Sequence, residues 1–143
     1  MAAIVEYKNG MEIQLDHLIV HARDRVAAAR RLAEILGCAW AEQAAIGPFS
    51  PVYVSSSLTL DFDQVEEGAA VPLSHYAFRV DEAKFDEILA RLQALGIAYR
   101  STPMGPVDHQ VNPAFGGRLV YWSEPDGHAW EVLTVSYARE QAP

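Results

Sequence analysis

Apolar and polar residues alternate over two short segments of the chain, and each segment leads into a pattern with helical spacing. The alternation at 15–22 and 73–80 predicts strands with one apolar face. After the second segment, apolar residues recur along one helix face, at Phe85, Ile88, Leu89, Leu92 and Leu95. Asp24 and Asp81 are suited to cap the two helices at their starts, and Gly37 and Gly96 to end them.

The two segments are copies of one unit. "LDHLIVHARDRVAAARRLAEILG" and "LSHYAFRVDEAKFDEILARLQALG" each place a histidine in the first strand and end the helix at Leu-Gly. Strand patterns follow each helix, with hairpins predicted around 55–57 and 124–127, where Pro125 and Gly127 favour a type I turn. Each unit therefore reads as a strand, a helix and three further strands.

The boundaries of the units follow from composition. The first unit is expected at 13–62 and the second at 73–137, with a polar, proline-ended linker at 63–72 between them. Residues 1–12 are expected to form an N-terminal extension and residues 138–143 a C-terminal tail. The stretch from Thr102 to Gly117 has little periodicity, and loops of that length are often functional.

Composition limits the partners of the chain. The 143 residues carry a net charge of −8 without a basic cluster, so neither nucleic acid nor an anionic membrane is expected as a partner. A single cysteine excludes an internal disulfide. No signal peptide and no apolar run long enough to span a bilayer is found, so a cytoplasmic location is expected.

The two repeated strands present polar side chains on one face. Alternation places His17 and His21 opposite the apolar face of the first strand, and His75 and Arg79 opposite that of the second. If the apolar faces pack on the helices, the histidines face away from them. Two twisted sheets would then direct His17 and His75 into a shared concavity.

Glu131 lies between Trp130 and Val132 in the last predicted strand, where an unpaired carboxylate is costly to bury. Aligning "AWEVLT" with "SLTLDF" makes Thr59 its counterpart in the first unit. Two imidazoles and one carboxylate form a three-ligand set that leaves coordination positions open. We therefore expect His17, His75 and Glu131 to hold a divalent metal.

"LDHLIV", "SHYAF" and "PDGHAWEVLT" resemble the vicinal-oxygen-chelate superfamily, which includes glyoxalase I, type I extradiol dioxygenases, fosfomycin-resistance thiol transferases and bleomycin-binding proteins. The resemblance extends from about residue 13 to residue 137. It implies an α+β fold in which two paired βαβββ modules form a curved, barrel-like mixed β-sheet cleft with the helices outside. It also implies a substrate that chelates the metal through neighbouring oxygens.

The resemblance assigns the metal ligands to His17, His75 and Glu131. Glyoxalases usually have a fourth ligand where Thr59 stands, and threonine is a poor ligand, so Thr59 is expected to contact substrate instead. The three-ligand pattern is closer to the dioxygenases and the fosfomycin-resistance proteins. In both, a tyrosine ten residues before the glutamate faces the substrate, and Tyr121 matches it as a catalytic candidate.

Other positions refine the comparison. Fosfomycin-resistance transferases carry a threonine where this chain has Ile19, which argues against that activity. Extradiol enzymes use an additional histidine, for which His109 and His21 are the candidates. Arg79 shares the face of His75 and is expected to hold an anionic substrate.

The leading hypothesis is an extradiol dioxygenase-like metalloenzyme that acts on a small oxygen-rich molecule with Fe(II). The alternative is a glyoxalase-like lyase or isomerase, or a thiol transferase, with Mn, Zn, Ni or Co. A second alternative is a metal-free protein that binds a small drug. Since the resemblance allows the modules to pair within one chain or between two, a homodimer with two sites is expected.

Overall fold

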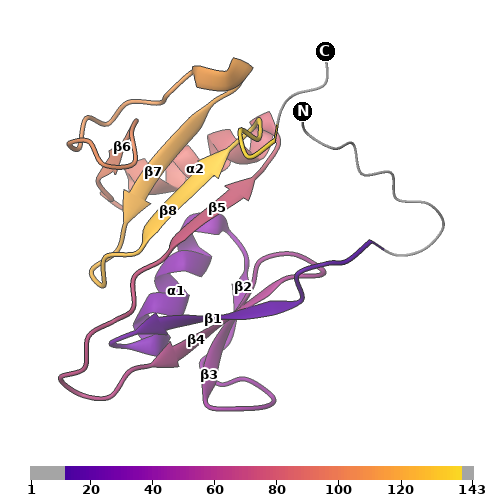
Figure 1. Cartoon of the computed structure of the whole chain (residues 1–143), viewed down its shortest axis with the longest axis vertical. Helices are drawn as coiled ribbons and strands as arrows, with labels where there is room; N and C mark the ends of the chain where they lie inside the picture. The colour runs from indigo at the N-terminus through magenta and orange to yellow at the C-terminus, as the bar shows by residue number, and fades with distance from the viewer. Residues whose placement is uncertain (1–11, 140–143) are drawn as a thin grey trace.

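The computed structural model describes residues 12–139, which form two four-stranded mixed sheets, each with one long helix (Figure 1). The first module comprises β1 (His17–Ala22), α1 (Arg25–Leu36), β2 (Ala39–Trp40), β3 (Phe49–Tyr53) and β4 (Thr59–Gln64). The second comprises β5 (His75–Arg79), α2 (Glu82–Ala94), β6 (Tyr99–Arg100), the 3₁₀ turn η1 (Ala114–Gly116), β7 (Leu119–Ser123) and β8 (Ala129–Leu133). The predicted extension and tail lie outside the described residues, apart from residue 12 and residues 138–139.

The two sheets have the same topology. Their strand orders are β1-β4-β3-β2 and β5-β8-β7-β6. In each module the first strand pairs in parallel with the last, and the other pairs are antiparallel. The repeat predicted from the sequence is therefore confirmed as two βαβββ modules of an α+β fold, and the sheets do not close into a barrel.

The predicted helix caps are confirmed. The carboxylate of Asp24 accepts a hydrogen bond from Ala27 N at 3.1 Å, and that of Asp81 accepts one from Lys84 N at 2.8 Å. Gly37 ends α1 with φ of 70°, a left-handed conformation that glycine adopts without a steric penalty. Because each helix begins directly after a histidine-bearing strand, its cap determines how β1 connects to α1 and how β5 connects to α2.

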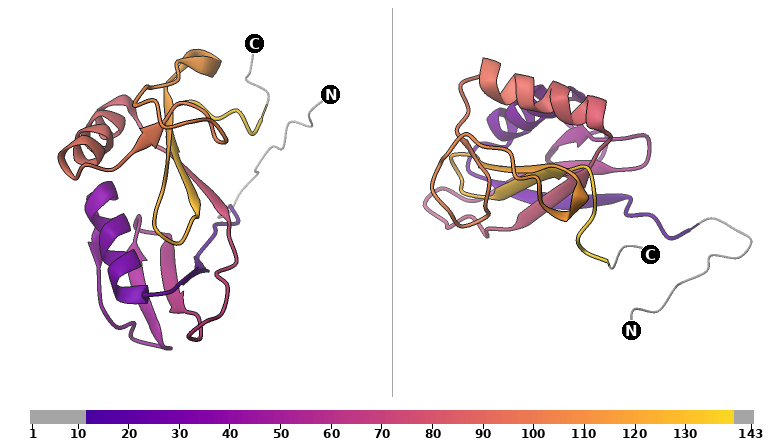
Figure 2. Two further views of the ribbon diagram at one scale, coloured as in Figure 1. Left: turned by 90° about the vertical axis from the view of Figure 1, so that its left-hand side faces the viewer. Right: turned by 90° about the horizontal axis from the view of Figure 1, so that it is seen from above.

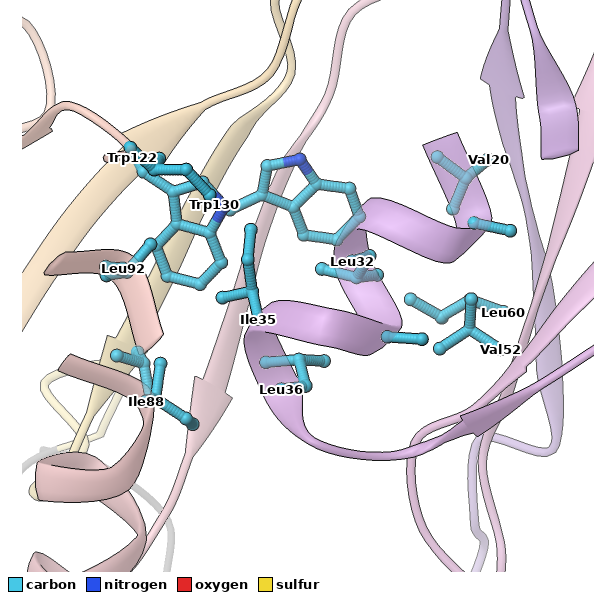
Figure 3. Close-up of a cluster of buried hydrophobic side chains, with 14 of the residues drawn as sticks. Val20, Leu32, Ile35, Leu36, Val52, Leu60, Ile88, Leu92, Trp122 and Trp130 are labelled. Carbon is cyan, nitrogen blue, oxygen red and sulfur yellow. The ribbon is translucent and has the colours of Figure 1, made fainter. Parts of the chain in front are cut away.

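One hydrophobic core joins the two modules within the chain. Figure 3 shows Ile35 of α1 close to Trp130 of the second module, while Val20 and Leu60 pack on the first-module side of the same helix. The rings of Phe62 and Trp130 also stack across the boundary, with centroids 6.4 Å apart. Figure 2 shows both helices on one side of the molecule and the strands on the other, so each sheet has one face turned away from the helices.

His128 links the modules from inside. Because His128 directly follows the turn at 124–127 and alternates with Glu131, the sequence predicts a side chain on the solvent side, but it is only 1% exposed and that prediction is wrong. Nδ1 accepts a hydrogen bond from Ser74 N at 3.1 Å, and Nε2 lies 2.7 Å from the carbonyl oxygen of His21 in the first module. Since a neutral imidazole has one donor and one acceptor, this environment fits the tautomer with the proton on Nε2.

Replacing His128 is expected to destabilise the fold. Asparagine is too short to reach both partners, so His128→Asn leaves a buried backbone group without a hydrogen bond. We expect a loss of about 2–4 kcal/mol in the free energy of unfolding. Urea unfolding measures it, with His109→Asn on the exposed loop as the control. Equal unfolding free energies for the two variants would refute this role for His128.

None of the helices among residues 12–139 is both long and apolar enough to cross a membrane.

Candidate metal centre

A row of polar side chains crosses the open face of the second sheet. Glu131 on β8 lies directly opposite Tyr121 on β7 and Ala77 on β5, and Tyr121 lies opposite Arg100 on β6. Cross-strand partners share a face, so these residues are neighbours on the side turned away from α2. His75 belongs to the same face, because it stands two residues before Ala77.

Glu131 is completely buried, and only one of its carboxylate oxygens has hydrogen-bond partners. Oε1 accepts a hydrogen bond from the hydroxyl of Tyr137 at 2.6 Å and lies 3.0 Å from His75 Nε2. Oε2 is buried and has no hydrogen-bond partner among residues 12–139. A buried carboxylate with an unpaired oxygen is costly unless a cation binds it, so this oxygen fits a metal ligand.

His75 faces an acceptor with each ring nitrogen. Nδ1 lies 3.0 Å from the carbonyl oxygen of Ala129, while Nε2 lies 3.0 Å from Glu131 Oε1. A neutral ring carries only one N–H, so it can donate to only one of these oxygens. When Nδ1–H bonds to a carbonyl, Nε2 is the nitrogen that can bind a metal, which is the usual arrangement around histidine ligands.

His17, like His75, has its Nδ1 next to an oxygen acceptor, but it lies apart from His75 and Glu131. Its Nδ1 lies 2.7 Å from Asp16 Oδ2, and its side chain is 60% exposed. This hydrogen bond is the main cause of the raised pKa of His17, and the charge of Asp61 adds to it. No group of three or more His, Cys, Asp or Glu side chains able to hold a metal occurs among residues 12–139. One chain thus brings His75 and Glu131 together and leaves His17 outside the pair.

The strand register corrects the predicted counterpart of Glu131. His17 pairs with Thr59, whereas His75 pairs with Ala129, so Thr59 corresponds to Ala129. The first-module position that corresponds to Glu131 is therefore Asp61, which is half-buried on the open face of β4. Asp61 is a carboxylate that the sequence alignment missed.

Two tyrosines adjoin Glu131, and only Tyr121 was expected from the sequence. Burial is the main cause of the raised pKa of Tyr121; the hydroxyl of Tyr137 opposes the shift and the charge of Glu131 adds to it. Burial likewise raises the pKa of Tyr137, followed by its hydrogen bond to Glu131. Both phenols therefore stay protonated at neutral pH. Tyr137 follows β8 in an irregular segment, where no sequence pattern indicates where the side chain points.

A cleft of about 630 Å³ opens beside His75 and Tyr137. It extends along β5 and the segment after β8, and its lining includes Arg79 and Arg139. Arg79 is exposed and forms no ion pair within residues 12–139. The lining of the cleft thus combines two arginines with one carboxylate, Glu12, beside the candidate ligand His75.

The other candidates lie elsewhere. His21 is half-buried on β1, and His109 is on the exposed loop with φ of 52° and its ring 4.9 Å from that of Tyr99. In the described part of the chain, neither ring forms a hydrogen bond with His75 or Glu131.

Comparison with solved structures relates the chain to oxidases. It is 42% identical to the oxidase ChaP-H1, over 90% of this chain and 100% of that one, with a TM-score of 0.79. It is 38% identical to the oxidase ChaP-H2, over 89% and 97% of the two chains, with a TM-score of 0.80. A glyoxalase/dioxygenase from Nostoc punctiforme shares the fold, at 18% identity over 91% and 99% of the two chains and a TM-score of 0.62. No protein-family model and no curated protein sequence matches the chain.

The chain belongs to the same family as these two ChaP-type oxidases, and this similarity supports an enzyme. It shares its fold with a fosfomycin-resistance protein and a lactoylglutathione lyase, at 20% and 18% identity, as the resemblance to the vicinal-oxygen-chelate superfamily predicts.

Proposed function

We propose that the chain is a metal-dependent enzyme that oxidises a small, oxygen-rich molecule with dioxygen. In this proposal His75 and Glu131 of one chain and His17 of a second copy hold a divalent metal. The observation that carries the proposal is the buried Glu131 beside His75, because its Oε2 has no hydrogen-bond partner in the described part of the chain. The similarity to two oxidases favours oxygen chemistry over the other reactions of the superfamily.

A second copy of the chain would complete the ligand set. The side chain of His17 is 60% exposed, and within residues 12–139 its Nε2 forms no hydrogen bond. Ile19 and Tyr53, on the same open face of the first sheet, are 36% and 44% exposed. This face carries exposed apolar side chains beside a histidine with a free nitrogen, and it also carries Asp61, so it is suited to pack against the second module of another chain through both apolar and polar contacts. We therefore propose a homodimer with two sites, each built from both chains.

The residues around the site have separate tasks in this proposal. When bound, a divalent metal supplies a Lewis acid that stabilises negative charge on adjacent substrate oxygens. Tyr121 is protonated at neutral pH, so it donates a hydrogen bond or a proton to a substrate oxygen. Arg79 offers its charge to an anionic group of the substrate in the cleft beside His75. The complete burial of the Glu131 side chain excludes bulk water from its carboxylate.

Oxygen consumption tests the reaction. We expect the iron-loaded protein to consume dioxygen with a member of a panel of catechols and ene-diols, and to give no product without oxygen. Tyr121→Phe should lower the turnover number by about a hundredfold, because general acid–base groups contribute on that order. No consumption with any compound of the panel would refute the oxidase proposal.

One observation favours a second candidate, a glyoxalase-like lyase or isomerase. The register gives Asp61 the position in the first module that Glu131 has in the second, so the fourth glyoxalase ligand, which the sequence alignment placed at Thr59, would correspond to Asp61. This candidate predicts turnover with Zn or Ni under anaerobic conditions and loss of that turnover in Asp61→Asn. The oxidase proposal predicts that iron and oxygen are both required.

A further inference from the structure

Tyr137 contacts the candidate ligand Glu131 from outside the sheets. It follows β8 in the irregular segment 134–139, and its hydroxyl donates to Glu131 Oε1 at 2.6 Å. The chain therefore turns back after the strand to reach a residue six positions earlier. Backbone pairing reaches one residue past β8, where Thr134 N donates to Arg118 O at 3.0 Å, so the sheet does not require the contact at Tyr137.

The contact determines which carboxylate oxygen is free. His75 Nε2 and the Tyr137 hydroxyl both approach Oε1, at 3.0 and 2.6 Å, whereas no group of the described residues forms a hydrogen bond with Oε2. The terminal torsion of a glutamate has broad, roughly two-fold minima, so a carboxylate without such contacts exchanges its two oxygens freely. When His75 Nε2 binds a metal it has no proton for Oε1, so the hydrogen bond from the Tyr137 hydroxyl is the contact that restricts this rotation and leaves Oε2 as the available ligand atom.

Tyr137 is itself held from the other side. The ring of Phe115 packs against it with centroids 5.0 Å apart. Phe115 has a left-handed backbone with φ of 63°, which is unfavourable for a bulky residue and is maintained only by its surroundings. A Cβ at the neighbouring Gly117 would lie 2.6 Å from Thr134 Oγ1 and Val135 Cγ2, so the segment before β7 fits closely on the segment that carries Tyr137.

We propose that Tyr137 is a positioning residue that orients Glu131 so that Oε2 alone is presented to the metal, with Phe115 holding Tyr137 in place. This inference rests on the proposed function, because it requires Glu131 to be a metal ligand. Outer partners of metal ligands typically affect metal affinity by 10- to 100-fold, about the size of effect expected here.

The experiment measures Co(II) binding by the chelator-treated full chain, by calorimetry and by the visible absorption spectrum of the bound ion. Tyr137→Phe removes only the hydroxyl. We expect about a 10- to 100-fold loss of Co(II) affinity and a changed spectrum. The matched control is Tyr99→Phe, which loses the hydrogen bond from Gln93 Nε2 on the helix side of the sheet and should bind as the wild type does.

The outcomes separate the two proposals. If the wild type does not bind Co(II), the metal site itself is refuted. If the wild type binds and Tyr137→Phe has the same affinity and spectrum, the role of Tyr137 is refuted and the metal site stands. Should Tyr137→Phe fail to fold, Phe115→Leu takes its place, with about a threefold loss of affinity expected and an unchanged affinity contradicting the inference.

Discussion

Glu131→Gln is expected to lose the metal and to keep the fold. Glutamine has the size of glutamate but no charge, so the substitution removes an anionic ligand without opening a cavity. We expect the metal affinity to fall by more than about a hundredfold, beyond the effect of changing an outer partner. Without metal, the free energy of unfolding of the variant should exceed that of the wild type by about 1 kcal/mol, because a buried charge has been removed. Competition titration with a chelator and thermal unfolding measure the two effects.

Glu124→Gln is the control, with the opposite expected effects on stability and metal binding. Glu124 accepts hydrogen bonds from His128 N at 2.6 Å and from Trp130 Nε1, in the turn between β7 and β8. This variant should unfold more easily and bind metal normally. A Glu131→Gln variant that binds metal as tightly as the wild type would show that Glu131 is a structural carboxylate.

Mixing two inactive variants should restore metal binding. In a dimer with shared sites, a chain with His17→Ala and a chain with Glu131→Gln form one site that carries both changes and one that is intact. With random pairing after unfolding and refolding together, about a quarter of all sites should be intact. Metal content and turnover of the mixture should therefore rise from near zero to about a quarter of the wild-type values.

A second mixture controls for non-specific rescue. His75 and Glu131 belong to the same chain's half of each site, so mixing His75→Ala with Glu131→Gln produces no intact site. Recovery in neither mixture would mean that the modules pair within one chain. Equal recovery of metal binding in both mixtures would mean that His75 and Glu131 of one site come from different chains.

Much of the architecture could be predicted from the sequence, because it depends on local patterns. The repeat, the caps Asp24 and Asp81, and the faces of β1 and β5 all follow from periodicity. The predicted counterpart of Glu131, Thr59, was wrong, because the strand register makes Asp61 the counterpart. The two positions are two residues apart, and a shift of two leaves every side chain on the same face, so alternation does not distinguish them. Register depends on turn lengths and tertiary packing, which alternation does not encode.

Two residues of the site region could not be found from the sequence. The burial of His128 depends on the packing of one module against the other, through the carbonyl of His21. The position of Tyr137 depends on the path of an irregular segment after β8. Conversely, the pairing of His75 with Glu131 was predicted, since both belong to the same module and to strands that pair directly.

Elemental analysis of the native protein, purified without chelator and separated as a dimer by gel filtration, tests the central claim most directly. The account predicts about one divalent metal ion per chain, lost on substitution of His17, His75 or Glu131. A chain that contains no metal as purified, and takes up none when divalent ions are added, would contradict it.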